Sequence, residues 1–377
     1  MKFVISTQEF NYLISKCQHV VPPNPTMPIL SNILIEAKNG ELTLTATDLT
    51  VGVRCFTEAK VLEEGSTTLP AKKLSSLIRE LTSMNVEVTT NDHHVTEIIA
   101  DSSKFKLHGM AGSNFPDLPS FGDATPVKLT QEQLKEMFFR TSFAVSKDDT
   151  RYALTGVFLH IENGKASFVG TDGKRLARTH LDMQVDPSFS GSYIVPIKAV
   201  DEILKNLKEE GDATLYLLND KIAVETENSL HVSKLLSGDY PDVNRVIPEQ
   251  SAQVVTLHRE ELLTLLRQVS LFTAEGYHSV RFSFGNGEVK LSANTKDIGE
   301  GNVSMPVNYH AEQIDIAFDP TFFMDILKHT RGERVTLGVT DSFNPGVITD
   351  SEEGTTATAG NSPLFVLMPM RLSENVG

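Results

Sequence analysis

The sequence predicts an α+β fold made of three repeated domains, each of which is a doubled β-α-β-β-β unit. Three observations support this prediction. Amphipathic helices recur at matching positions along the 377 residues, stretches of alternating apolar and polar residues follow them, and an Asn-Gly pair opens the same hairpin three times. We place the domains at residues 1–121, 126–250 and 253–377.

A first helix opens each domain, directly after a short β-like stretch. Ser6 with Glu9, and Thr130 with Gln133, have the spacing of a capping box, in which two side chains bond the free N–H groups of a helix start. The apolar residues that follow recur at i, i+3, i+4 and i+7, which is one buried helical face. The predicted helices span 7–20, 130–146 and 258–270.

A second helix and its strands complete each domain. Pro70, Pro196 and Pro320 stand at the helix starts, where the missing N–H of proline costs nothing. These helices are predicted at 71–82, 196–208 and 320–332. Period-two stretches, typical of strands, follow the hairpin pairs Asn39-Gly40, Asn163-Gly164 and Asn286-Gly287.

So many matches indicate an internal duplication. Duplication by itself says nothing about assembly. A three-domain chain with no special quaternary geometry therefore remains an alternative.

The charge is strongly acidic overall but uneven. Lys and Arg number 34 against 49 Asp and Glu, a net charge of −15, whereas a DNA-binding protein usually presents a basic patch. The six predicted helices sum to +4, so the remainder carries −19. Mildly basic helices suit a surface that lies along nucleic acid without binding it tightly. Ordinary solvated helix faces are the simpler explanation of the same count.

The sequence contains no motif of a known catalytic chemistry, neither a phosphate-binding GxxxxGK[ST] loop nor HExxH, GxSxG or GxGxxG. Gly170–Arg175 is predicted to be a turn rather than a phosphate site, and His93 with His94 a solvated hairpin tip rather than a metal site. Cys17 and Cys55 are too few for a disulfide framework. With no signal peptide and no long apolar run, we expect a soluble cytoplasmic protein without cofactor or metal.

Short motifs spread over the whole chain carry a resemblance to a known family. They are Met1–Phe3, Pro25–Leu30 with Asn32, Thr47-Asp48, Arg151-Tyr152, Thr171–Leu176, Ser233–Leu235, Tyr240–Asp242, Arg245-Val246 and Val366–Leu372. Together with the triple repeat, they resemble the bacterial sliding clamps, the beta subunits of DNA polymerase III. The terminal motif is the most specific, and in the family it ends the chain, whereas Ser373–Gly377 follow it here.

The resemblance implies a function. Two chains would form a head-to-tail homodimer, a ring of six DNA-clamp domains with helices lining a central hole and sheets outside. The ring would encircle duplex DNA without sequence specificity and tether the replicative polymerase. The DNA polymerase III alpha subunit, the clamp loader, other polymerases and repair proteins would dock through short linear peptides, with no membrane partner.

The resemblance also implies three sets of site residues. The set for DNA is Asn24, Lys72, Lys147, Arg151, Tyr152 and Lys198. The set for the dimer interface is Lys104, Phe105, Lys106 and Leu107 against Leu271, Phe272, Asp297 and Glu300. The set for a peptide pocket is Leu154, Thr171, Gly173, Lys174, Arg175, Leu176, Pro241, Val246, Tyr277, Phe322, Val366, Met368, Pro369, Met370, Arg371 and Leu372. The chain departs from the family at Asn24 and Asp148, and a tyrosine pair is reduced to Tyr152-Ala153.

Two other functions compete with this interpretation. One is an enzyme with its site between repeats, which the missing motifs weigh against. The other is a repeat-built scaffold that binds peptides but not DNA. Retention on nicked circular DNA, lost when the DNA is linearised, would distinguish a ring from both.

Overall fold

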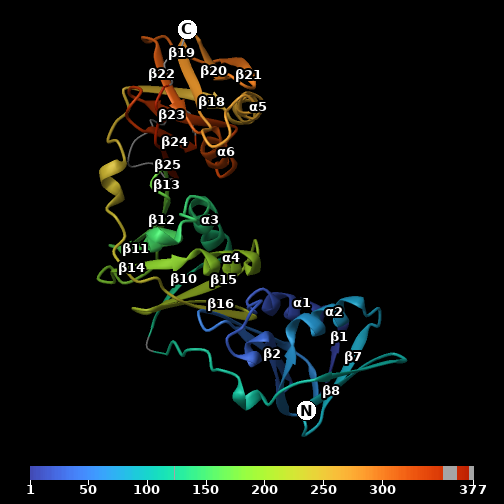
Figure 1. The fold of residues 1–377 in the computed structure, drawn as a ribbon. Coiled ribbons are helices and arrows are strands. Elements are labelled where there is room, and N and C mark those ends of the chain that lie inside the picture. Colours follow the sequence, from blue (N-terminus) through green and yellow to red (C-terminus); the bar gives the residue numbers. More distant parts are fainter. Residues whose placement is uncertain (123, 351–362, 373–377) are drawn as a thin grey trace. The chain divides into compact units, whose positions relative to one another are not determined.

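A computed structural model describes residues 1–122, 124–350 and 363–372. All six predicted helices are present, at the predicted places and with shorter ends (Figure 1). They are α1 (Thr7–Gln18), α2 (Ala71–Glu80), α3 (Gln131–Ser142), α4 (Ile197–Asn206), α5 (Arg259–Ser270) and α6 (Pro320–Lys328). The short 3-10 helices are η1 (Pro28–Ser31), η2 (Gly112–Asn114), η3 (Asp149–Thr155) and η4 (Val243–Val246).

The chain divides into two compact units, which we call unit 1 and unit 2. Unit 1 comprises Met1–Lys135, Met183–Val185 and Val195–Leu236. Its five-stranded sheet has the order β5 (Lys60–Glu63), β1 (Lys2–Ser6), β7 (Asn85–Thr90), β8 (Val95–Ala100) and β9 (Ser103–His108). Its eight-stranded sheet has the order β10 (Thr125–Thr130), β15 (Asp212–Leu217), β16 (Lys221–Thr226), β17 (Ser229–Lys234), β4 (Val51–Glu58), β3 (Glu41–Thr47), β2 (Asn32–Lys38) and β6 (Gly65–Pro70).

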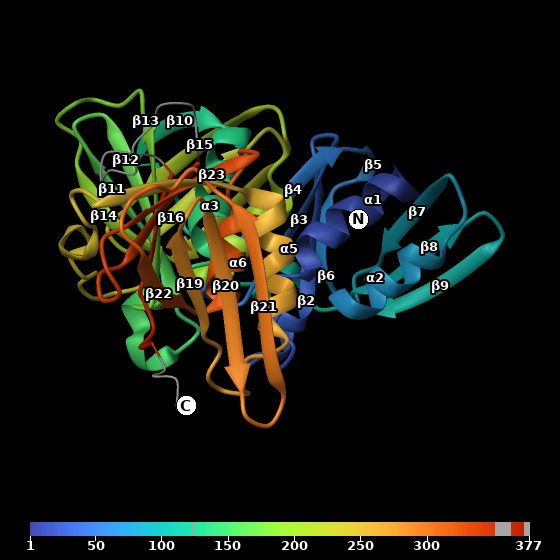
Figure 2. The ribbon, with the colours of Figure 1, turned by 90° about the horizontal axis from the view of Figure 1, so that it is seen from above.

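Unit 2 comprises Glu136–Asp182, Asp186–Ile194 and Ser237–Gly377. Its eight-stranded sheet has the order β14 (Gly191–Pro196), β11 (Gly156–Glu162), β12 (Lys165–Thr171), β13 (Arg175–Asp182), β25 (Leu364–Leu367), β24 (Gly346–Asp350), β23 (Arg334–Val339) and β18 (Gln253–His258). Its four-stranded sheet has the order β21 (Gly299–Pro306), β20 (Glu288–Thr295), β19 (Val280–Gly285) and β22 (Ile314–Phe318). In Figure 2, β20 and β21 form a long hairpin, and β9 lies at the edge of its own sheet.

Local sequence signals account for the element starts and turns. Ser6 accepts a hydrogen bond from the Glu9 N–H at 3.1 Å. The second capping box is complete, because Thr130 and Gln133 bond each other's backbone N–H groups at 3.1 and 2.9 Å. The asparagine and glycine of all three predicted hairpin turns have positive φ, the conformation that a tight hairpin needs. These predictions are confirmed.

The doubled β-α-β-β-β unit is also confirmed, because β6, β14 and β22 each lead into a second helix. Each eight-stranded sheet, however, draws strands from two of the predicted domains, so the compact units cut across the range 126–250. The exact bounds of the three domains stay a prediction.

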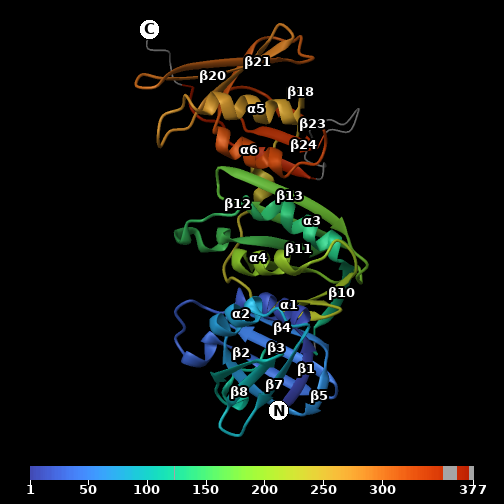
Figure 3. The ribbon, with the colours of Figure 1, turned by 90° about the vertical axis from the view of Figure 1, so that its right-hand side faces the viewer.

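Helices pack against one face of the sheets and bury the core. In Figure 3, α1 lies beside α2, and α5 lies beside α6, as their contacts also indicate. Fully buried phenylalanines join helix to strand in edge-to-face or stacked pairs, such as Phe3 with Phe10 and Phe282 with Phe323. Within the described residues, no helix has the length and apolar character of a membrane span.

Candidate functional site

An apolar groove of about 190 Å³ opens on unit 2. Its walls come from the β12–β13 turn, the segment around η4 and the end of β25. The structure brings together nine residues of the predicted peptide pocket, namely Leu154, Thr171, Gly173, Arg175, Leu176, Pro241, Val246, Val366 and Met368. Asp242 and Val243 also line the groove and were missed. The repeat of Phe115–Leu118 in Tyr240–Val243 was the signal that could have found them.

The floor of the groove is a rigid turn between β12 and β13. The Asp172 carboxylate accepts hydrogen bonds from the N–H groups of Lys174 and Arg175 at 2.9 and 3.0 Å. The Thr171 hydroxyl donates to the Arg175 carbonyl at 2.6 Å and accepts from the Gly173 N–H. Gly173 has φ +83°, which favours glycine. Asx-type bonds of this kind hold a turn without help from the rest of the sheet.

Arg175 fixes one wall of the groove. Its buried guanidinium bonds Asp172 at 3.2 Å, Asp325 at 2.9 Å and the Phe143 carbonyl at 2.9 Å. Burial raises the pKa of Asp325, but hydrogen bonds from Arg175 and Lys328 outweigh it and hold that pKa below its ordinary value. The same guanidinium lies 4.6 Å from the centre of the Phe322 ring. Phe322 therefore stands beside the groove rather than in its lining.

The chain after β25 forms a tail that three hydrogen bonds tether to the rest of unit 2. The Met368 N–H donates to the Lys174 carbonyl at 2.9 Å, and the Met370 N–H donates to the Ala317 carbonyl at 2.7 Å. The Tyr277 hydroxyl donates to the Arg371 carbonyl at 3.2 Å. Val366 belongs to the core, whereas Met368 is 41% exposed over the groove. Lys174, Tyr277, Pro369, Met370, Arg371 and Leu372 do not line the groove.

The rim of the groove carries unpaired positive charge. Lys174 and Arg371 are exposed, and neither has an ion-pair partner in the part of the chain that the structure describes. Arg151 is exposed beside the turn, and a Cβ built on Gly173 would lie 2.6 Å from its Nη1 atom. In a chain of net charge −15, exposed cations at these positions favour an acidic ligand.

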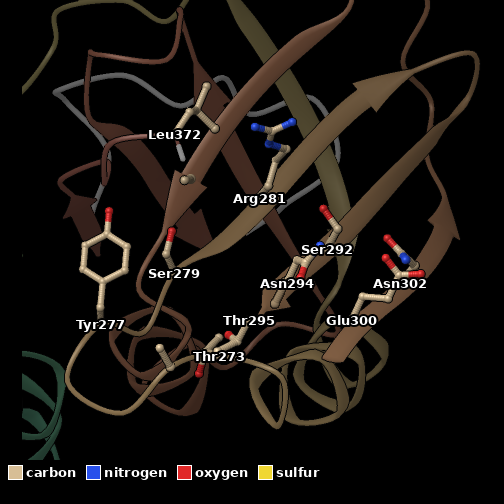
Figure 4. A pocket seen from close by; sticks show the side chains of 13 residues that line it. Thr273, Tyr277, Ser279, Arg281, Ser292, Asn294, Thr295, Glu300, Asn302 and Leu372 are labelled. Atoms are coloured by element: carbon tan, nitrogen blue, oxygen red, sulfur yellow. The ribbon is translucent and has the colours of Figure 1, made fainter. Parts of the chain in front are cut away.

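A second cavity, of about 400 Å³, lies on the outer face of β19, β20 and β21. Figure 4 shows its lining, which is mostly polar and includes Arg281, Ser292 and Asn302. Tyr277 and Leu372 from the predicted pocket set also line this cavity. It is larger than the groove, but a ligand site usually combines an apolar lining with a few polar groups. The smaller groove fits that description better.

The predicted interface residues lie on two free sheet edges and beside them. Lys104–Leu107 belong to β9, the edge strand of the five-stranded sheet, and Glu300 belongs to β21, the edge strand of the four-stranded sheet. Asp297 is exposed in the turn between β20 and β21. Leu271 is 73% exposed after α5, and the Phe272 ring covers Gly301.

The predicted DNA residues are exposed on several elements. Asn24, Lys72 and Lys198 lie in unit 1, and Lys147, Arg151 and Tyr152 lie in unit 2. Lys198 forms an ion pair with Asp48. Burial raises the pKa of Asp48, but this ion pair and two backbone N–H groups outweigh it and lower that pKa. Contacts of these six residues with DNA stay a prediction.

No cluster of side chains suited to a metal ion occurs among residues 1–122, 124–350 and 363–372. Cys17 and Cys55 are buried as free thiols. His93 and His94 lie in the loop between β7 and β8, as predicted. The additional residues Ser373–Gly377 lie outside the described residues.

Comparisons with known proteins agree over the whole chain. Models of the DNA polymerase III beta subunit match in three parts, the N-terminal domain at residues 1–119, the central domain at 128–242 and the C-terminal domain at 244–363. The beta sliding clamp of Chlamydia pneumoniae is 52% identical over 375 residues and is covered completely, as is this chain. That of Haemophilus influenzae is 28% identical over 374 residues, covering 99% of this chain and 100% of the relative.

Solved structures give the same result. The DNA polymerase III subunit beta of Pseudomonas aeruginosa superposes with a TM-score of 0.91 at 28% identity, covering 99% of this chain and 100% of that one. The sliding clamp of Bacillus subtilis superposes with a TM-score of 0.93 at 24% identity and the same coverage, which supports the fold alone.

Proposed function

Because the chain belongs to the family of DNA polymerase III beta subunits, the beta sliding clamps, we propose that two copies close head to tail into a ring around duplex DNA. Family membership makes the chain a processivity clamp of DNA replication rather than an enzyme. A clamp of this kind tethers a polymerase by topology, so tight binding to phosphates is unnecessary. The net charge of −15 is compatible with that mode of action.

A pairing rule within the chain carries the proposal of a ring. The final strand of a domain pairs with the strand that completes the Asn-Gly hairpin sheet of the domain before it, as β17 does with β4 and β25 with β13. The final strand of the first domain is β9, and the strand that completes the hairpin sheet of the third domain is β21. Both lie at free sheet edges, so the same rule would pair β9 with β21. Among the described residues, β9 and β21 do not pair with each other. A second copy supplies the missing partner, and a heterologous contact of this kind closes into a ring when the rotation fits.

The register of the two internal joints predicts the register of the third. If β9 pairs with β21 in the register of β17 with β4, Lys106 lies opposite Glu300 and Phe105 lies opposite Gly301. Phe105 is on the same side of its sheet as the buried Ile98, and Phe272 covers Gly301. Phe105 and Phe272 would therefore form an apolar contact on one side of the joint. Lys106 and Glu300 would pair on the other side, where an exposed ion pair contributes only about 0–1 kcal/mol.

Cross-linking tests this register. A chain with Lys106→Cys and Glu300→Cys should form an intermolecular disulfide on mild oxidation, seen as a covalent dimer on a non-reducing gel, because opposite residues of antiparallel strands are within disulfide reach. The matched control is Lys106→Cys with Asn302→Cys, which moves one cysteine two residues along β21. Equal cross-linking of both variants, or none in either, would contradict the proposed joint.

The groove of unit 2 is the proposed docking site for partners. A short extended peptide with Leu or Phe anchors would fill the apolar lining, and the tethered tail with Met368 would form one wall, since methionine adapts to different partners. By family resemblance, the partners are the DNA polymerase III alpha subunit, the clamp loader, other polymerases and repair proteins. The cationic rim supports peptides that carry acidic residues between or beside their anchors.

A further inference from the structure

The turn that floors the groove exists twice. In unit 1, the Asp48 carboxylate accepts from the N–H groups of Thr50 and Val51 at 2.8 and 2.7 Å, as Asp172 does in its own turn. The Thr47 hydroxyl donates to the Val51 carbonyl at 2.9 Å and accepts from the Leu49 N–H at 3.0 Å, as Thr171 does. Leu49 takes φ +73°, close to the +83° of Gly173. A leucine in that conformation indicates that the surrounding structure imposes the turn.

The neighbours of this turn are duplicated as well. β17 pairs with β4 in the register in which β25 pairs with β13, so Val232 takes the place of Val366. The Lys234 N–H donates to the Thr50 carbonyl at 2.9 Å, the equivalent of the bond from Met368. Segment Phe115–Leu118 repeats Tyr240–Val243. Unit 1 therefore repeats the turn, the paired strand and the covering segment of the groove in unit 2.

The two copies differ at the anchor pocket. Gly52 stands where the groove of unit 2 has Leu176. A Cβ built on Gly52 would lie 2.5 Å from Leu118 Cδ2 and 2.9 Å from Val232 Cγ2. The Leu118 side chain thus occupies the space that Gly52 leaves empty. Its counterpart in unit 2 is the shorter Val243, which only lines an open groove.

We propose that the turn of residues 47–52 is a second peptide groove whose anchor pocket is filled in cis by Leu118. By filling the pocket, Leu118 limits each chain to one docked peptide. The inference rests on the proposed peptide docking in unit 2. The ligand of the emptied groove is of the same class, a short extended peptide with an apolar anchor. Lys234 beside the pocket stands where unit 2 has the apolar Met368.

Isothermal titration with a synthetic acetylated peptide, Asp-Leu-Asp-Leu-Phe, tests the inference. The wild-type chain should bind one peptide. The variant Leu118→Ala with Lys234→Met should bind two, because it empties the pocket and restores the methionine wall. The control Leu118→Met with Lys234→Met keeps the pocket filled and should bind one. Leu118 is only partly buried, so the fold should tolerate these changes, and Leu118→Val with Lys234→Met is the milder alternative.

The possible outcomes distinguish the second groove from the peptide-docking proposal for unit 2 on which it rests. A wild-type chain that binds no peptide contradicts the docking proposal for unit 2. A wild-type chain that binds one, with folded Leu118 variants that also bind one, overturns the second groove. To locate the added site, Leu154→Glu with Met368→Glu should remove the first groove and leave one peptide bound to the emptied one.

Discussion

Arg175 shows how much of the groove one residue organises. Its guanidinium joins the β12–β13 turn to α6 through Asp172 and Asp325, and it supports the Phe322 ring. The family resemblance indicated that Arg175 belongs to the groove. It did not indicate the bond to Asp325, because 150 positions separate the two residues and no local spacing encodes their contact. The turn around Asp172 was easier to predict, since its bonds span only two or three positions.

Asp325→Asn should destabilise unit 2 by about 1–3 kcal/mol near neutral pH, because it leaves a buried guanidinium short of charge compensation. The folded pKa of Asp325 is lowered. The contribution of its carboxylate is therefore present above the unfolded pKa of about 3.9 and is lost as pH falls through the folded value. Urea unfolding of both proteins between pH 7 and pH 3 measures this. A difference that stays constant down to pH 3 would rule out the ionised pair as its source.

Lys174→Glu should weaken binding of an acidic peptide to the groove by a few-fold, with little effect on a neutral peptide that has the same anchors. The reason is that Lys174 is an exposed rim charge, and such charges act over a Debye length of about 10 Å at 0.1 M salt. Fluorescence anisotropy at low and high salt measures the effect. Lys290→Glu, on the exposed surface of β20, is the matched control. Equal losses for both peptides would argue for a packing role of Lys174.

Elements follow the local signals where those signals act over one turn. Caps and hairpins matched the prediction, but five of the six helices, all except α5, end earlier than predicted. α3 stops at Ser142 rather than at residue 146, because Ala144 and Val145 are buried in the core after the helix has ended. Apolar spacing reports burial, and burial continues past the last helical hydrogen bond. The edge strand β5 was missed because its residues Lys60–Glu63 are mostly exposed and lack a clear alternation.

Thr130→Ala should destabilise the start of α3 by about 1 kcal/mol, since it removes one half of a complete capping box. Hydrogen exchange of the first-turn amides is the most direct measurement, because both units need not unfold together. Thr130→Ser keeps the hydroxyl and should exchange like the wild type. Unchanged protection in Thr130→Ala would mean that strand β10 alone holds the helix start.

At the scale of the whole molecule, the sequence predicts the threefold repeat but not the sharing of sheets between domains. Repeats are visible as matching residues, whereas β17 with β4 and β13 with β25 are pairs between strands far apart in the chain. No single-sequence pattern specifies which strand edge meets which. The same limit applies to the proposed joint between β9 and β21.

The protein should stay on nicked circular DNA after loading and leave it when the circle is linearised, because enclosure rather than affinity would retain it. The six predicted helices carry a net charge of only +4, and each phosphate contact contributes about −0.9 to the salt slope. Binding to a short linear duplex should therefore be weak at physiological salt. Gel filtration of the loaded complex measures retention, and nanomolar affinity for the linear duplex would contradict enclosure as the mechanism.

The sheets shared between domains also affect folding during synthesis, because paired strands are made at different times. β13 ends at Asp182, but its partner β25 begins only at Leu364. A ribosome adding about 5–20 residues per second needs roughly 10–40 s for the stretch between them. During that time β13 is an unpaired edge that other nascent chains can join. Slowing translation should therefore lower the yield of native protein more than a destabilising surface substitution does, and co-translational chaperones should reverse the loss.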